Sequence, residues 1–125
     1  MIALAGGKPG VQIQGRSLLP LFEPPGLSKA STRPKVPWRK SLLVEYWAEN
    51  AMPWLVGMTY KAVRTDQYKL IHWVNRGDAG ELDELYDLDQ DPFELKNLIR
   101  SKAKAGVRDR LRKELRKLTA DALGM

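Results

Sequence analysis

The 125-residue chain contains no cysteine, which excludes disulfide bonds, thiolate metal sites and a cysteine nucleophile. His72 is its single histidine, so a metal site built from several histidines is excluded as well. No apolar run approaches the roughly 20 residues that a membrane-spanning helix requires. The first seven residues, MIALAGG, are too short for a secretory signal peptide and lack its basic start. The sequence therefore predicts no membrane segment and no metal site in this chain.

Proline and glycine are dense in the first part of the chain. Six prolines and several glycines lie between residues 6 and 37, which prevents long helices and interior strands there. We interpret residues 1–40 as a connector or arm and residues 41–125 as a folded domain, whose core belongs to about eighty residues.

Apolar residues inside this arm need a surface that the arm itself does not offer. They are Leu18, Leu19, Leu21 and Phe22. The MIALAGG segment is typical of the last turn of a helix closed by glycine. Both features predict that the chain is a piece of a longer protein, and that the isolated chain self-associates through residues 18–22.

The rest of the chain predicts an α+β fold, a small antiparallel sheet of about four strands packed by a long C-terminal helix. Strands are predicted near residues 42–47, 59–64, 68–73 and 84–88, where β-preferring residues concentrate. The helix is predicted near residues 102–123, because one apolar stripe repeats every three or four positions: Val107, Leu111, Leu115, Leu118 and Ala122. The sheet residues expected beneath this stripe are Leu42, Val44, Val63, Leu70 and Leu85. A short helix is predicted to begin at Asp91-Pro92 and to end near residue 97.

The net charge of +6 is unevenly distributed. Residues 1–65 and 98–125 each hold nine basic and three acidic side chains, whereas residues 66–97 hold three basic and nine acidic ones. This pattern indicates compensation within the fold and argues against nucleic acid as a partner. The basic residues of the last helix suit either a phosphate- or sulfate-binding face or, more commonly, a solvated one: Arg108, Arg112, Lys113, Arg116 and Lys117.

Other candidate sites are weaker. Asp87, Asp89 and Asp91 have the spacing of a calcium loop, but Pro92 and Leu98 stand where that loop needs glycine and glutamate, so helix capping explains them better. The run SKASTR (residues 28–33) nearly fits Ser-x-Ala-x-Arg, with the arginine one position late, and is rejected. His72 suits a structural role or a ligand contact. The four tryptophans (Trp38, Trp47, Trp54 and Trp73) suit packing or a stacking platform for sugars or bases.

Four motifs, in order, resemble the C-terminal subdomain of the type I sulfatases, the formylglycine-dependent, arylsulfatase-like family. KAVRTDQYKLIHW (residues 61–73) and ELYDLDQDPFELKNL (84–98) carry most of the likeness. SLLVEYW (41–47) resembles the preceding strand, and QGRSLLPLF (14–22) resembles the connector that enters the subdomain. The likeness covers nearly the whole chain.

The resemblance implies a supporting role in the hydrolysis of sulfate esters. In this family the formylglycine nucleophile, the calcium ion and the catalytic residues belong to a large N-terminal domain, and none has a counterpart here. The expectation is a C-terminal fragment that is inactive alone, stabilises the missing catalytic domain and forms part of the wall of the pocket for a sulfated carbohydrate. The wall candidates are Glu45, Tyr46, Trp47, Arg64, His72 and Trp73, with the loop 48–57. Family members are often periplasmic, secreted or lysosomal, and no export signal is visible in this sequence.

An alternative from a different class remains open at this point. The last helix and residues 33–40 are both basic. They also suit a free-standing module that binds nucleic acid or a sulfated glycan.

Overall fold

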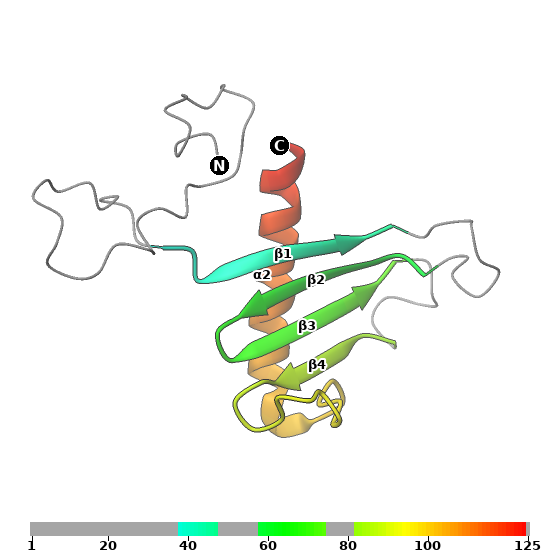
Figure 1. Ribbon diagram of the computed structural model, residues 1–125, viewed down its shortest axis with the longest axis vertical. Coiled ribbons are helices and arrows are strands. Elements are labelled where there is room, and N and C mark those ends of the chain that lie inside the picture. The colour runs from blue at the N-terminus through cyan, green and yellow to red at the C-terminus, as the bar shows by residue number, and fades with distance from the viewer. Residues whose placement is uncertain (1–37, 48–57, 75–81, 125) are drawn as a thin grey trace, which may run out of the picture. The chain divides into compact units, whose positions relative to one another are not determined.

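The computed structural model describes residues 38–47, 58–74 and 82–124. The chain divides into two compact units, Met1–Trp38 and Arg39–Met125, and the second holds the elements described below. They are strands β1 (Ser41–Tyr46), β2 (Tyr60–Thr65), β3 (Tyr68–Trp73) and β4 (Glu84–Asp87), the 3-10 turn η1 (Lys102–Lys104) and helix α2 (Ala105–Leu123) (Figure 1). The loop 48–57 and the apolar residues 18–22 of the predicted arm lie outside the described residues.

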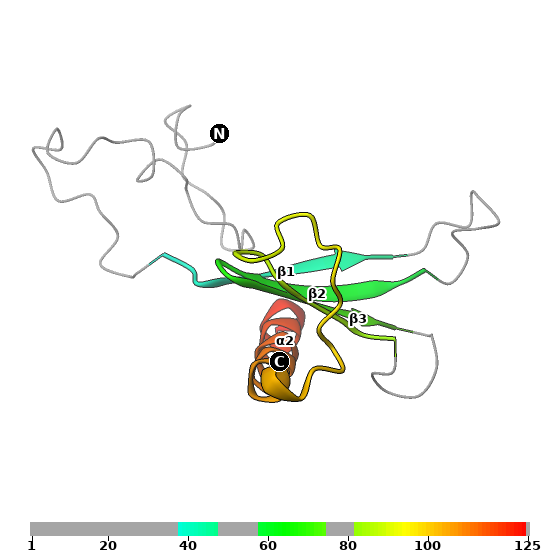
Figure 2. The same cartoon turned by 90° about the horizontal axis from the view of Figure 1, so that it is seen from below.

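The four strands form one antiparallel sheet in the order β1-β2-β3-β4, and α2 runs across one of its faces (Figures 1 and 2). The predicted α+β fold is confirmed. Each strand begins and ends within one residue of its predicted bounds, and the predicted long helix corresponds to η1 followed by α2. The concentration of β-preferring residues therefore located the four strands, and hydrophobic periodicity located the helix.

The hairpin between β2 and β3 sets the register of the sheet. The Thr65 hydroxyl accepts a hydrogen bond from the Tyr68 N–H at 2.9 Å and donates one to the Tyr68 carbonyl at 3.0 Å. This side-chain clamp closes the turn at Asp66 and Gln67. It places Val63 directly opposite Leu70, so the apolar positions of both strands share a face.

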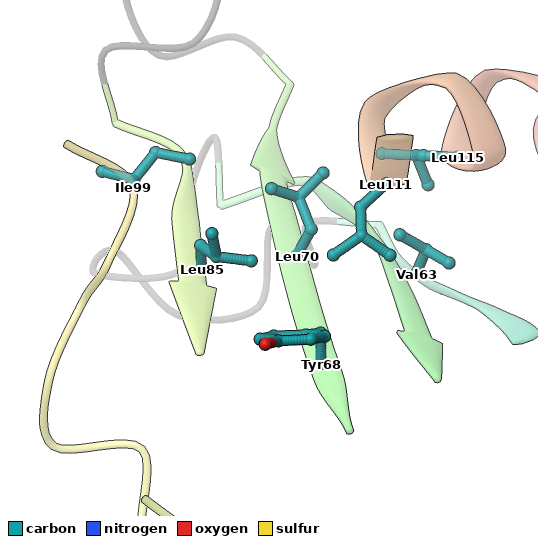
Figure 3. Close-up of a cluster of buried hydrophobic side chains, with 7 residues drawn as sticks. All are labelled: Val63, Tyr68, Leu70, Leu85, Ile99, Leu111 and Leu115. Carbon is teal, nitrogen blue, oxygen red and sulfur yellow. The ribbon is translucent and has the colours of Figure 1, made fainter. Parts of the chain in front are cut away.

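The core lies between this face and α2. Val63, Leu70 and Leu85 form a cross-strand row on β2, β3 and β4, and all three are fully buried. Leu111 and Leu115 of α2 pack on this row, and Tyr68 and Ile99 close it at the side (Figure 3). Burying one such side chain contributes about 1.5–3 kcal/mol to folding, so this small cluster is the main stabilising element of the unit.

The predicted core residues of β1 are wrong. Leu42 and Val44 are 41% and 38% exposed, whereas Leu43 packs against the core cluster. The pairing of Leu43 with Val63 decides the register, because side chains alternate between faces and partners share one. Three consecutive apolar residues allowed either assignment from the sequence.

The helix stripe is confirmed for most of its length. Leu111 and Leu115 are buried, and Val107 and Leu118 pack against the core from either side. Ala122 is exposed, contrary to the prediction, because the last turns of α2 extend past β1 (Figure 1). The helix ends at Gly124, whose φ of 72° is a left-handed conformation that glycine adopts without strain.

The predicted short helix at residues 91–97 does not form. The Asp91 carboxylate accepts hydrogen bonds from the N–H groups of Leu95 and Lys96, at 3.1 and 2.7 Å, four and five residues ahead, whereas a helix cap accepts from the second or third residue ahead. Glu94 has a φ of 57°, a left-handed conformation that stops helical propagation. The Glu94 side chain forms an ion pair with Lys69 of β3 in place of a capping box. The segment is thus a chain of turns fastened to the sheet.

Candidate functional site

Most of the predicted wall residues gather at one end of the sheet. Because the strands are antiparallel, the end of β1, the start of β2, the end of β3 and the start of β4 meet at the same edge. Two rows cross this strand-end edge: Tyr46, Tyr60 and Trp73 on one face, and Glu45, Lys61 and His72 on the other.

Arg64 lies apart from the other wall candidates. It is paired with Leu42 and Lys69, beside the β2–β3 hairpin and at the opposite end of the strands. The structure therefore brings together Glu45, Tyr46, Trp47, His72 and Trp73 and leaves Arg64 distant from them.

An aromatic ladder forms the first row. The rings of Tyr46 and Tyr60 stack with centroids 5.6 Å apart, and Tyr60 meets Trp73 edge-on at 5.4 Å. The Trp73 indole N–H donates to one oxygen of Glu84 at 3.0 Å, and the Tyr86 hydroxyl donates to the other at 2.7 Å. Burial, followed by the bond to Glu84, raises the pKa of Tyr86 to about 12. The ladder thus presents aromatic ring surface, and the indole N–H of Trp73 already has its hydrogen-bond acceptor in Glu84.

The second row combines charge with an aromatic ring. Lys61 forms an ion pair with Glu45 at 3.1 Å, and its ammonium group lies 5.6 Å from the centre of the Trp47 ring. A cation held against an indole in this way fixes both side chains. The Trp47 side chain nevertheless remains 63% exposed, so its surface is available for contact.

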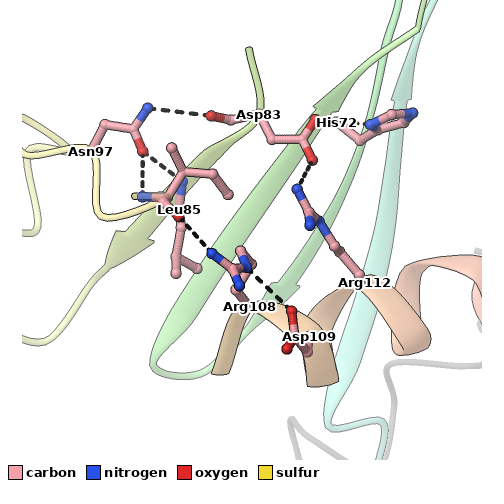
Figure 4. A network of polar contacts seen from close by, with 8 residues as sticks. His72, Asp83, Leu85, Asn97, Arg108, Asp109 and Arg112 are labelled. Carbon is pink, nitrogen blue, oxygen red and sulfur yellow. Dashed lines mark hydrogen bonds and ion pairs between the residues drawn. The ribbon is translucent and has the colours of Figure 1, made fainter. Parts of the chain in front are cut away.

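His72 is held by a buried carboxylate. The Nδ1 atom of His72 lies 2.8 Å from Asp83, and Arg112 of α2 donates to the other oxygen of Asp83 at 2.9 Å (Figure 4). Asp83 is 3% exposed, whereas 40% of the His72 side chain is exposed. Because an ionised Asp83 only accepts hydrogen bonds, the bond orients the imidazole and leaves Nε2 as its second polar atom.

Asn97 ties this network to the core. Its amide oxygen accepts from the N–H groups of Leu85 and Ile99, both at 3.0 Å, and its amide nitrogen donates to the Asp83 carbonyl at 3.3 Å. Arg108 donates to the Ile99 carbonyl at 3.2 Å. The backbone around Asp83 is therefore fixed on both sides (Figure 4).

The sequence prediction placed Arg108 and Arg112 on the outer basic face, but both are half-buried and engaged. It assigned no role to Asp83. The exposed basic face of α2 is thus confined to four residues: Arg110, Lys113, Arg116 and Lys117.

Two of the three acidic residues of the DLDQD run (residues 87–91), Asp87 and Asp91, are used structurally, whereas Asp89 is exposed. Asp87, 3% exposed, accepts from Lys104 at 3.0 Å, and Lys104 also donates to the Tyr68 hydroxyl at 2.9 Å. The hydrogen bond from Lys104 lowers the pKa of Asp87, while the bonds to Tyr68 and Asp87 raise the pKa of Lys104.

Across the described ranges, no group of three or more His, Cys, Asp or Glu side chains is placed to hold a metal ion. No helix in these ranges is long and apolar enough to cross a membrane.

Comparison with known proteins identifies the family. Residues 1–121 match the family model described as N-sulphoglucosamine sulphohydrolase, C-terminal. The chain is 33% identical over 98 residues to an N-acetylglucosamine-6-O-sulfatase of Bacteroides thetaiotaomicron, covering 76% of this chain and 15% of that protein.

Two solved structures share the fold. One, a complex with its substrate D-glucosamine-2-N,6-O-disulfate, superposes with a TM-score of 0.73 at 29% identity, over 96% of this chain and 22% of the other. A phosphonate monoester hydrolase of Agrobacterium radiobacter superposes with a TM-score of 0.59 at 24% identity, over 86% of this chain and 20% of the other. The chain thus spans less than a quarter of each of these relatives. Its sequence over residues 1–121 and its sheet-and-helix fold show that it belongs to the C-terminal domain family of the sulfatases.

Proposed function

We propose that the chain serves a sulfatase as its C-terminal domain, stabilising the catalytic domain and forming part of the substrate-pocket wall, without hydrolysing sulfate esters alone. The match of residues 1–121 to a sulfatase C-terminal family is the observation that carries this proposal. The relatives are several times longer than the chain, which leaves room for a separate catalytic domain.

The division of labour is supported by the residues that the chain contains. Hydrolysis by this family requires a formylglycine made from Cys or Ser in a specific motif, together with calcium held by Asp and Asn side chains. The chain has no cysteine, and its nearest serine motif has its arginine one position late. In the DLDQD run, Asp87 is engaged by Lys104 and Asp91 by two backbone N–H groups. Formylglycine and calcium therefore belong to the catalytic domain in this proposal.

The strand-end edge suits a wall for a sulfated carbohydrate. Sugar rings pack on aromatic faces, and sulfate oxygens accept hydrogen bonds from cationic or neutral donors. The edge offers the exposed ring of Trp47, the aromatic ladder and the oriented His72. One solved relative was obtained with a disulfated glucosamine, which supports a sulfated amino sugar as the substrate class.

A chimeric enzyme tests the supporting role. The segment of the Bacteroides N-acetylglucosamine-6-O-sulfatase that matches this chain is replaced by residues 1–125, and sulfate release from 6-O-sulfated N-acetylglucosamine is measured. We expect the chimera to fold and to release sulfate, while the relative truncated before this segment and the isolated chain do not. Equal activity in the truncated enzyme would contradict a stabilising role, and an inactive, unfolded chimera would contradict the assignment.

A matched pair of variants in the same chimera tests the wall. His72→Ala should raise KM roughly tenfold if the imidazole contacts substrate, since one lost hydrogen bond to a charged group represents about 1.4 kcal/mol. Lys113→Ala, on the exposed side of α2, should leave KM unchanged. An unchanged KM in the His72 variant would remove that residue from the wall.

A further inference from the structure

The two faces of the sheet differ in what covers them. Helix α2 lies on one face, over the row of Val63, Leu70 and Leu85 (Figure 3). The register places a second apolar set on the opposite face, called here the open face: Leu42, Val44, Tyr46, Tyr60, Ile71 and Trp73. No described helix or strand lies over this face (Figure 2).

The open face exposes large apolar side chains. Leu42 and Val44 are 41% and 38% exposed on the edge strand β1. At the centre, Ala62 is 2% exposed between Val44 and Ile71, its larger cross-strand neighbours. A contiguous apolar surface of this kind marks an interaction site more often than a solvated one.

The segment after β4 extends this surface. It rises on the side of the sheet opposite α2 before the chain crosses to the helix (Figure 2). Phe93 and Leu95 of this segment are 81% and 84% exposed. Asp91 and the Lys69–Glu94 ion pair hold the segment in place, so these side chains are presented by a fastened turn.

Two polar clusters on the open face are already paired, which lowers the cost of covering them, whereas the exposed Arg64 beside Leu42 would need a partner on the covering surface. Glu84 accepts from both Trp73 and Tyr86, and Lys69 is paired with Glu94. The outer side of α2 differs, since Arg110 and Lys113 are exposed charges whose burial would require new partners. Among the described residues, one exposed cation on the open face, Arg64, stands against four on the outer side of α2, so the charge distribution favours the open face as the buried surface.

We propose that the part of the open face away from the aromatic ladder (Leu42, Val44 and Ile71), together with Phe93 and Leu95, is the surface on which the catalytic domain of the sulfatase packs. This inference rests on the proposed function and adds which side of the sheet is used. The catalytic domain is the proposed occupant because of the length of the relatives. The solved relative is more than four times as long as the portion matched by this chain, so a much larger domain adjoins the matched portion in that protein. A second copy of the chain, or its own residues 18–22, would be a different occupant that the experiment distinguishes.

Side-chain labelling by hydroxyl radicals, read by mass spectrometry, compares the isolated chain with the active chimera. We expect labelling of Leu42, Phe93 and Leu95 to fall in the chimera to the level of buried Leu70. Leu123, 65% exposed at the end of α2, serves as the matched reference and should be labelled equally in both.

A pair of double variants gives an independent measurement. L42Q/V44Q should lower the melting temperature of the chimera more than that of the isolated chain, while K113Q/K117Q lowers neither. For each variant, the change in melting temperature in the chimera is compared with the change in the isolated chain, so any loss of stability of the domain itself affects both values equally.

The outcomes separate this inference from the proposed function. An active chimera in which open-face labelling is unchanged, or in which Leu123 is protected instead, overturns the assigned face while the supporting role stands. If the open-face residues of the isolated chain are protected from labelling and the protection grows with concentration, the face binds a second copy and the inference is overturned. If they are protected equally at every concentration, residues 18–22 cover the face and the inference is overturned as well.

Discussion

Replacing Asp83 by asparagine tests whether the buried carboxylate fastens the helix to the sheet. The asparagine side chain is nearly isosteric with that of aspartate but uncharged, and one of its two polar atoms is a donor. Arg112 would then lose its charged acceptor, and His72 would keep its bond only by changing tautomer to accept from the asparagine amide. The backbone carbonyl at position 83 would keep its bond from Asn97, so the perturbation is confined to the side chain.

The magnitude follows from burial. Breaking a fully buried ion pair costs about 3–5 kcal/mol because an unpaired charge remains in the interior. Here the carboxylate is 3% exposed but the Arg112 side chain is 33% exposed, so water recovers part of the loss. We expect the free energy of unfolding to fall by roughly 2–3 kcal/mol. For a unit of this size, the melting temperature should fall by roughly 10–20 °C.

Urea unfolding followed by tryptophan fluorescence measures this change, and Asp109→Asn is its control. Asp109 also accepts from an arginine, Arg108, at 3.2 Å, but it is 66% exposed, so its loss should cost less than about 0.5 kcal/mol. A double-mutant cycle of Asp83→Asn with Arg112→Gln should give a coupling energy of roughly 1 kcal/mol or more. Equal effects of the two asparagine variants would refute the argument that this carboxylate fastens α2.

Three further predictions concern the core and the titrating groups. Leu70→Ala should lower the free energy of unfolding by about 2–5 kcal/mol in the same urea assay, while Leu42→Ala should cost less than about 1 kcal/mol. Ultraviolet absorbance should show one phenol that titrates with a pKa of about 12, and this titration should be absent in Tyr86→Phe. Because the pKa of Tyr86 in the folded protein lies above the ordinary value of 10.0, the free energy of unfolding should fall as pH rises from 10 to about 12. Lys104 lowers the pKa of Asp87 below 3.8, so the stability contributed by the ionised carboxylate should be lost as pH falls below that value, and Asp87→Asn should remove this part of the acid transition.

Local sequence patterns were sufficient to locate the strands and the helix. The apolar stripe from Val107 to Leu118 corresponds to the buried side of α2, and the short turn after Thr65 fixes the register of β2 and β3. Both signals act over a few neighbouring residues, which is why a single sequence contains them.

The turn at residues 91–97 shows where local signals compete. Asp91-Pro92 has the composition of a helix start, and Asp91 does accept from two N–H groups. The Glu94 side chain instead pairs with Lys69, 25 residues away in sequence, and its backbone adopts a left-handed φ of 57° that ends helical propagation. A capping pattern specifies the chemistry of the first turn and leaves its continuation to tertiary contacts.

The His72 network was missed for a related reason. Asp83 and Arg112 are 29 residues apart, and nothing local links a loop carboxylate to one arginine among several on the helix. Helical geometry offers a partial signal, since Arg108 and Arg112 each stand three residues before a buried leucine, Leu111 and Leu115, and therefore border the buried stripe. The position at the margin of the stripe distinguishes Arg112 from Lys113, which is exposed to solvent.

The wrong register on β1 has a physical origin that bears on the open face. A strand that is buried on one side and solvated on the other alternates apolar with polar residues, whereas a strand covered on both sides does not. Leu42, Leu43 and Val44 are consecutive, and α2 accounts only for Leu43. The composition of β1 is therefore that of a strand with two neighbours, one supplied by α2 and the other by the surface proposed to pack on the open face. A docked catalytic domain would explain Leu42 and Val44, the two residues of this run that α2 leaves exposed.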